Sequence, residues 1–338
     1  MIRKAVIPVA GFGTRMLPAS KSIPKEMLPV VDRPAIAYVV DEAVRAGITE
    51  IILVSHASKS AVENYFDGHP ELEAQLEAKG KTELLAQVRH PPPDGVQVVS
   101  VRQGPPLGLG HAVHAAHQLV GDEPFVVILP DVLVDALDDT DDLTAMVRRF
   151  EESGAAQIMV EAVPDDRVDQ YGIAELDGPS PAPGASAPMR AVVEKPKPAD
   201  APSNLSVVGR YVLPAGIMGL LADAIADLIA RQPVEAYAMR GRTFDCGSKA
   251  GYLQAILHYA AKDPDLAEVL AGAGLVGAGP VGAGPARERS QSDRQDPRAP
   301  SKYASSDASG IPPAGDAGLS RAGPAPTKPA PAGDRSRD

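Results

Sequence analysis

Glycines and cations gather in one short stretch near the N-terminus. Gly11 and Gly13 follow an apolar run over 5–9, and the cations Arg15, Lys21 and Lys25 come shortly after them. Glycine has no side chain, so the backbone there can approach a ligand closely. Exposed N–H groups together with cations attract anions. We therefore predict a phosphate-handling nucleotide site at the end of the first strand.

A carboxylate stands at a comparable place later in the chain. Asp131 directly follows the apolar run 124–129, which predicts a buried strand. A carboxylate at a strand end is a natural ligand for a hard cation such as Mg²⁺, although it could also cap the segment that follows. The residues His111, His114 and His117 recur at three-residue steps, so a metal site there is possible in principle, but no carboxylate or cysteine accompanies them.

The elements that must position these residues alternate along the chain. Continuous apolar runs alternate with helical stretches, a pattern typical of a parallel sheet covered on both faces. Strands are predicted at 5–9, 50–55, 96–101, 124–129, 156–163, 172–176, 190–193, 207–213 and 234–239. Helices are predicted at 35–46, 58–66, 71–89, 110–119, 143–152, 220–230 and 252–260. The fold class is therefore α/β, with a Rossmann-like mixed, mainly parallel sheet flanked by helices, and its carboxyl edge holds the Gly11 loop and Asp131.

Composition narrows the class of protein. The 338 residues carry a net charge of −11, which argues against a general nucleic-acid or membrane-surface binder. The single cysteine, Cys246, allows no intrachain disulfide, has no evident base beside it, and fits a cytoplasmic protein. The chain shows neither a signal-peptide pattern nor an apolar run of membrane-spanning length. Gly, Ala and Pro dominate from 272 onward, so we predict a domain over 1–271 and a disordered tail over 272–338.

Several motifs, taken in order, resemble a known family. They are Gly11-Phe12-Gly13-Thr14-Arg15 continuing to Pro24-Lys25-Glu26, Gln103-Gly104, Gly108-Leu109-Gly110-His111, Leu129-Pro130-Asp131, Glu194-Lys195-Pro196, Gly209-Arg210-Tyr211 and Asp245-Cys246-Gly247. From about residue 2 to about residue 260 the chain is similar to the bacterial UTP–glucose-1-phosphate uridylyltransferases, within the sugar-phosphate nucleotidyltransferases. The resemblance implies that a sugar 1-phosphate attacks the α-phosphorus of UTP and that pyrophosphate leaves. Charge then accumulates on phosphate oxygens, so cations and a metal are needed rather than a protein nucleophile.

The resemblance also implies a role for each site residue. Arg15, Lys25 and Lys195 would be catalytic, with Arg15 and Lys25 on the triphosphate, and Asp131 and Asp245 would hold the cofactor Mg²⁺. The nucleotide would be bound by Ala10, Gly11, Gly13, Thr14, Glu26, Gln103 and Gly108, and the sugar by Gly172, Glu194 and Lys195. Plainer interpretations stay open, since loop cations, loop Gln and Glu, and a turn aspartate at 245 are often simply solvated.

The chain departs from the family pattern in one place. A Gly-Glu-Ile-Gln-Leu-Thr segment, which in the family stands near the sugar side of the site, is missing before Asp223-Ala224-Ile225. The expected function is therefore UDP-glucose synthesis from UTP and glucose 1-phosphate. Alternatives are a thymidylyl- or cytidylyltransferase on the same scaffold, or a non-catalytic regulatory paralogue. The expected partners are these two substrates and further copies of the chain in a homodimer or homotetramer, with no nucleic acid and no membrane.

Overall fold

The computed structural model describes residues 1–105, 107–136, 141–219 and 224–275. Contacts divide the chain into Met1–Gly282 and Ala283–Asp338, and the second unit lies wholly outside the described residues. The predicted tail over 272–338 also lies outside them, apart from its first four residues, so the tail and the boundary at 271 stay predictions. Within the described part, no helix has the length and hydropathy needed to cross a membrane.

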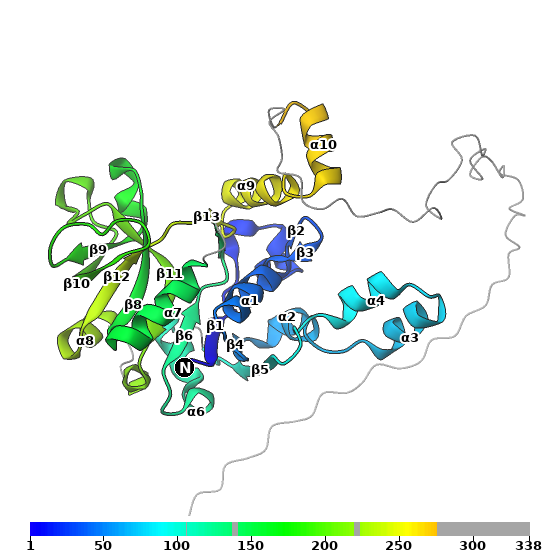
Figure 1. Ribbon diagram of the computed structural model, residues 1–338, viewed down its shortest axis with the longest axis horizontal. Coiled ribbons are helices and arrows are strands. Elements are labelled where there is room, and N and C mark those ends of the chain that lie inside the picture. Colours follow the sequence, from blue (N-terminus) through cyan, green and yellow to red (C-terminus); the bar gives the residue numbers. More distant parts are fainter. Residues whose placement is uncertain (106, 137–140, 220–223, 276–338) are drawn as a thin grey trace, which may run out of the picture. The chain divides into compact units, whose positions relative to one another are not determined.

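One nine-stranded sheet organises the described residues, in the order β5-β4-β1-β6-β11-β8-β12-β10-β9 (Figure 1). Its strands are β1 (Lys4–Pro8), β4 (Glu50–Ser55), β5 (Gln97–Arg102), β6 (Phe125–Ile128), β8 (Ala156–Ala162), β9 (Gly172–Leu176), β10 (Ser186–Glu194), β11 (Leu205–Leu213) and β12 (Val234–Ala238). Each predicted strand therefore corresponds to an observed one. The apolar runs were sufficient to find them, because strands buried on both faces are continuously apolar.

The direction of the strands corrects part of the prediction. β5, β4, β1 and β6 are parallel, and β8 and β12 are parallel to each other. β11 runs antiparallel to both β6 and β8, and β10 runs antiparallel to β12 and β9. The sheet is mixed as predicted, but its mainly parallel character is confined to the first half. Successive antiparallel strands need only short connections, and the second half has few helices to serve as crossovers.

Helices cover both faces of the sheet. One face carries α1 (Ala35–Arg45), α2 (Ser60–Asn64), α7 (Asp142–Ser153) and α9 (Lys249–Ala260), and the other carries α5 (Leu109–Ala115), α6 (His117–Val120) and α8 (Ala224–Arg231). Strand residues alternate between the two cores. Ala5 and Ile7 of β1 belong to the first core, and Val6 belongs to the second. This alternation is the period-two geometry of a strand with both faces buried.

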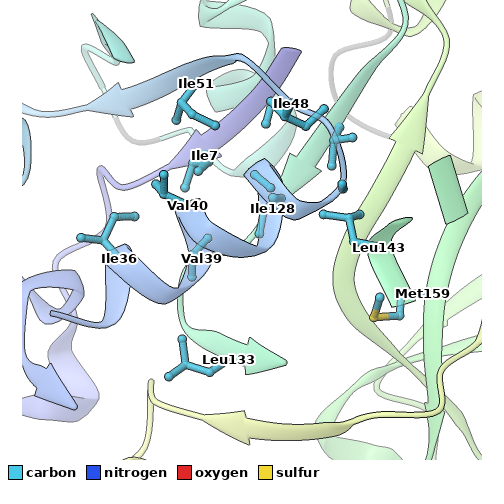
Figure 2. Packing of buried hydrophobic residues seen from close by; sticks show 14 of the residues in the cluster. Ile7, Ile36, Val39, Val40, Ile48, Ile51, Ile128, Leu133, Leu143 and Met159 are labelled. Atoms are coloured by element: carbon cyan, nitrogen blue, oxygen red, sulfur yellow. The ribbon is translucent and has the colours of Figure 1, made fainter. Parts of the chain in front are cut away.

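Helix α1 shows how the first core is built. Its apolar residues recur at helical spacing, so one side of the helix is buried against the sheet. Figure 2 shows Ile36, Val39 and Val40 of α1 lying among Ile7 of β1 and Ile128 of β6. Burying each such side chain stabilises the fold by about 1.5–3 kcal/mol. The packing fixes α1 over the strands whose carboxyl ends carry the site.

Three helical predictions need adjustment. The insertion predicted as one helix over 71–89 is a pair, α3 (Pro70–Ala78) and α4 (Thr82–Arg89), which pack on each other (Figure 1). Gly80 between them has φ 63°, a left-handed conformation that ends a helix. The stretch 110–119 is likewise divided into α5 and α6. The helix predicted over 220–230 is described from Ala224, and its first four residues lie outside the described part.

Two small two-stranded sheets and a further helix complete the described part. β2 (Pro29–Val30) pairs with β3 (Arg33–Pro34), β7 (Val132–Asp135) pairs antiparallel with β13 (Arg242–Asp245), and α10 (Pro264–Gly272) follows α9. The sequence did not predict the β7–β13 pair. Its register sets Val132 opposite Asp245, and Asp131 stands immediately before Val132. This pairing therefore brings two of the predicted site residues together.

Candidate active site

The glycine loop follows β1 at the carboxyl edge of the parallel strands. Gly13 has φ 65° and begins a 3₁₀ turn over Thr14–Met16, and the Ser20 hydroxyl donates to the Gly13 carbonyl over 2.8 Å. A Cβ atom on Gly13 would lie 3.2 Å from the Cβ of Lys25. Both the backbone conformation and this close contact require glycine. Gly13 therefore allows the stem of Lys25 to pack over the loop.

Two cations and two carboxylates meet beside this loop. The Lys25 ammonium lies 3.0 Å from Asp131 Oδ2. The Arg15 guanidinium bridges both acids, with Nη2 at 3.7 Å from Asp131 Oδ2 and Nη1 at 3.5 Å from Asp245 Oδ2. The loop after β1, the end of β6 and the end of β13 thus contribute to one charged cluster. Sequence reasoning had assigned these four residues to a single site, and the structure brings them together.

Electrostatics keep Asp131 ionised. Burial alone would raise the pKa of Asp131, but the Lys25 ammonium, which also donates a hydrogen bond, and the Arg15 guanidinium outweigh it, so the pKa is lowered. An ionised carboxylate is the form that binds a divalent cation. Cys246 behaves in the opposite way, because burial and the charges of Asp245 and Asp131 raise its pKa to about 12. The thiol is therefore protonated at neutral pH, and this form is a poor nucleophile.

Gly247 is a site residue that sequence reasoning did not single out. Its N–H lies 3.0 Å from Asp245 Oδ1 and 3.2 Å from the Asp131 carbonyl, so it ties the two acidic segments together. A Cβ atom at this position would lie only 2.6 Å from Nη2 of Arg15. A side chain at this position would displace the end of Arg15 from its present place between the two carboxylates. The available signal was its place in the Asp245-Cys246-Gly247 motif.

The two carboxylates fit a magnesium ion. Mg²⁺ usually takes one or two protein carboxylates and completes its coordination with phosphate oxygens and water. Asp131 and Asp245 supply two such groups, and both touch the same guanidinium. In the described residues, no group of three or more His, Cys, Asp or Glu side chains is placed to hold a metal, so His111, His114 and His117 do not form a site.

Two of the residues predicted to bind the base, Gln103 and Glu26, form hydrogen bonds within the protein. Gln103, at the end of β5, approaches the Gly108 carbonyl at 3.4 Å and Nδ1 of His111 at 3.0 Å through its amide nitrogen. Glu26 is buried, and its Oε2 accepts a hydrogen bond from Lys59 over 2.8 Å. Among the residues that the structure describes, the second oxygen of Glu26 is buried and has no hydrogen-bond partner. Lys59 is a residue that sequence reasoning missed.

The predicted sugar-binding residues form a second group. Gly172 of β9 pairs in register with Glu194 of β10, and a Cβ atom on Gly172 would lie 3.2 Å from Glu194 Oε2. Lys195 has a positive φ of 47°, donates its N–H to the Tyr171 carbonyl, and places its ammonium 3.3 Å from Glu194 Oε1. The Glu-Lys pair is exposed, so both charged groups are accessible to a ligand.

Tyr211 of β11 connects the two groups. Its side chain is buried, and burial together with the charges of Glu194 and Asp131 raises its pKa to about 12. The phenol therefore feels one carboxylate from each group. The arrangement offers cations and metal-binding oxygens on one side and a hydroxyl-accepting carboxylate with a cation on the other. It can hold two phosphorylated substrates next to each other.

Comparison with known proteins defines the class of this chain. The model of the nucleotidyl transferase family matches residues 4–258. The chain belongs to the nucleotidyl transferase family. It is 54% identical to the UTP–glucose-1-phosphate uridylyltransferase of Escherichia coli K12 over 277 residues, which cover 77% of this chain and 91% of that protein. It is 51% identical to the Haemophilus influenzae protein of the same name, over 78% of this chain and 95% of that protein.

Solved structures give the same grouping. A UTP-bound UDP-glucose pyrophosphorylase from Acinetobacter baumannii is 57% identical, with a TM-score of 0.79 over 81% of this chain and 99% of that one. A UDP-glucose pyrophosphorylase complexed with UDP-glucose is 34% identical, with a TM-score of 0.68 over 78% of this chain and the whole of that one. Within its family, the chain therefore groups with the UTP–glucose-1-phosphate uridylyltransferases, as its motifs indicated.

Proposed function

We propose that this chain transfers the uridylyl group of UTP to α-D-glucose 1-phosphate, giving UDP-glucose and pyrophosphate. The observation that carries the proposal is the cluster of Arg15, Lys25, Asp131 and Asp245, formed at the carboxyl edge of the sheet. The names of relatives about half identical to it support the choice of substrates. The chain's own cluster supports the chemistry.

Arg15 and Lys25 act on the triphosphate in this proposal. In the absence of substrate they neutralise Asp131 and Asp245. With substrate present, both cations turn to phosphate oxygens, where negative charge grows as pyrophosphate leaves. Arg15 is well suited to this change because its side chain is 62% exposed and its planar fork matches a phosphate. The attacking group is a phosphate oxygen of the sugar, so no protein nucleophile is required.

Asp131 and Asp245 would hold Mg²⁺. When bound, the ion supplies positive charge that neutralises phosphate oxygens and helps to orient the triphosphate. The chain contributes two carboxylates, Asp245 of β13 and Asp131 immediately before the paired strand β7, and the lowered pKa of Asp131 keeps that group ready for the ion. Thr14 and the backbone of Ala10, Gly11 and Gly13 complete the nucleotide side.

The base and the sugar are recognised by separate groups. Gln103, Gly108 and Glu26 would contact the base, and this contact requires Gln103 and Glu26 to exchange part of their present hydrogen bonding. Glu194 accepts sugar hydroxyls, Gly172 allows backbone approach, and Lys195 holds the sugar phosphate. A cytoplasmic location and a homodimer or homotetramer remain predictions.

The test is pyrophosphate release from UTP and glucose 1-phosphate in the presence of Mg²⁺. We expect turnover with UTP to exceed turnover with dTTP or CTP at equal concentrations. A higher rate with dTTP or CTP would favour the thymidylyl- or cytidylyltransferase alternative. Binding of UTP without turnover would contradict the proposal and favour a non-catalytic regulator, for which the missing segment before Asp223 is the motivating observation.

A further inference from the structure

Arg210 of β11 is fully buried and makes four hydrogen bonds, although the reaction assigns it no role. Its Nε donates to Glu42 Oε1 over 2.9 Å, and its Nη2 donates to Glu42 Oε2 over 2.6 Å. The same guanidinium donates to two carbonyls, from Nη1 to Leu129 over 3.0 Å and from Nη2 to Val132 over 2.8 Å. The guanidinium of Arg210 therefore binds the Glu42 carboxylate of α1 along one edge and two backbone carbonyls with its remaining N–H groups.

The two carbonyls stand on either side of Asp131. Leu129 and Val132 bound the short segment in which the chain leaves β6 and enters β7. Sheet pairing with β6 ends at Ile128, so the Leu129 carbonyl needs another partner, and leaving it unpaired inside the protein would be costly. Val132 pairs with Asp245 of β13, and its carbonyl also accepts a hydrogen bond from Arg210. One planar guanidinium spans both carbonyls, which the single ammonium of a lysine cannot do in the same way.

The neighbouring Gly209 supports this arrangement. Gly209 has φ 86°, and a Cβ atom on it would lie 2.9 Å from Cδ1 of Leu129. Its carbonyl accepts a hydrogen bond from the Leu129 N–H over 2.9 Å. Glycine at this position lets β11 approach the segment closely enough for Arg210 to reach both carbonyls. This contact gives a reason for the Gly209-Arg210 motif, to which no substrate-binding role was assigned.

We infer that Arg210, held by Glu42, is a positioning residue that fixes the Leu129–Val132 segment and so sets the Asp131 carboxylate for the divalent cation. The inference rests on the proposed metal role of Asp131. It differs from a purely structural salt bridge because the contacts go to the two carbonyls flanking that residue. Removing partners that orient a metal ligand typically weakens metal binding by about 10–100-fold.

The test uses a paired variant, Glu42→Met with Arg210→Met. Replacing both members of a buried ion pair with apolar residues leaves no lone buried charge, which favours a folded protein. The matched control is Arg149→Met with Glu235→Met. That pair is also bidentate, at 2.9 and 2.8 Å, and also joins a helix to a strand. Glu235 also accepts a hydrogen bond from Gln157, which is not a proposed site residue.

The measurement is isothermal titration calorimetry of UTP with EDTA and with Mn²⁺, without glucose 1-phosphate so that no turnover occurs. The ratio of the two dissociation constants reports how much the metal tightens UTP binding. We expect the Glu42/Arg210 variant to lose about tenfold of this ratio, and the control to stay within twofold of wild type. An unchanged ratio in a folded Glu42/Arg210 variant would overturn the inference.

Two further variants keep the test decisive. Arg210→Lys retains a charge beside Glu42 but cannot span both carbonyls, so it should also lower the ratio. If both Arg210 variants fail to fold while the control folds, a positioning role separable from folding is refuted. Asp131→Asn separates the two proposals. If this variant keeps the wild-type ratio of dissociation constants, the metal site itself is refuted. If it loses the ratio while the Glu42/Arg210 variant keeps it, only the positioning role of Arg210 is refuted.

Discussion

Replacing Gly247 with alanine should impair catalysis through Arg15 while leaving the fold nearly unchanged. The new Cβ would lie 2.6 Å from Arg15 Nη2 and 3.0 Å from Asp245 Oδ1. To restore ordinary van der Waals contact, the guanidinium has to move by about 0.8 Å. A misplacement near 1 Å can cost about 100-fold in rate. Arg15 turns to phosphate oxygens when substrate binds, so this figure is an upper bound, and we expect turnover to fall by about 10- to 100-fold.

The stability of the Gly247→Ala variant should change little. Arg15 is 62% exposed, and exposed ion pairs contribute only about 0–1 kcal/mol to the free energy of unfolding. Gly247 is also not among the glycines with positive φ, so alanine meets no backbone strain. Gly272→Ala is the matched control, because a Cβ atom there meets nothing within 4 Å. Thermal unfolding and pyrophosphate release should be measured on both variants.

A double variant distinguishes this mechanism from a general disturbance of the site. If Gly247→Ala acts by displacing Arg15, it should cost little further activity in an Arg15→Ala background, since contacting residues are not additive. An equal fractional loss of turnover from Gly247→Ala in the wild-type protein and in the Arg15→Ala variant would refute the reasoning. So would wild-type turnover in the single variant, because Arg15 would then tolerate the displacement that the geometry demands.

Three further outcomes are expected. Lys25→Ala should lower turnover by about 10²–10³-fold without unfolding the protein, and near-normal pyrophosphate release would remove Lys25 from the mechanism. Glu194→Gln should raise KM for glucose 1-phosphate while leaving the calorimetric Kd for UTP unchanged; a shift in the UTP Kd instead would place Glu194 on the nucleotide side. Because the folded-state pKa of Asp131 is lowered, its stabilisation is present above its unfolded pKa and is lost as the pH falls through the folded value. Urea unfolding should therefore show wild type and Asp131→Asn converging in stability at acid pH, and a constant difference down to pH 2 would contradict this.

Most strands of the fold could be predicted from the sequence, and the reason is local. Glu50–Ser55 was predicted with its observed bounds because its continuous apolar run is typical of a strand buried on both faces. The β7–β13 pair could not be found in this way. Each of its strands has four residues and mixes polar with apolar side chains. Their pairing depends on a register between segments about 110 residues apart, which no local pattern encodes.

The residues of the candidate site also differ in whether a local sequence pattern predicts their position. Arg15, Lys25 and Asp131 follow predicted strands or loops, so strand order alone brings them to one edge. Asp245 was implied only by the family resemblance, since its position depends on the pairing of β13 with β7. Arg210 and Lys59 have charged side chains and are nevertheless buried, because each meets a carboxylate far away in the sequence. The residue type alone predicts that such side chains are exposed, but the ion pairs formed in the folded protein keep them buried.

Strand β11 links the charged cluster around Asp131 to the group predicted to bind the sugar. It pairs with β6, whose end carries Asp131, and through Ser206 with Ile173 of β9, next to Gly172. Arg210 and Tyr211 are consecutive, so their side chains point to opposite faces of the sheet. Arg210 holds the segment around Asp131, and Tyr211 lies within the field of both Asp131 and Glu194. A displacement of β11 would therefore alter the metal carboxylate and the sugar carboxylate together.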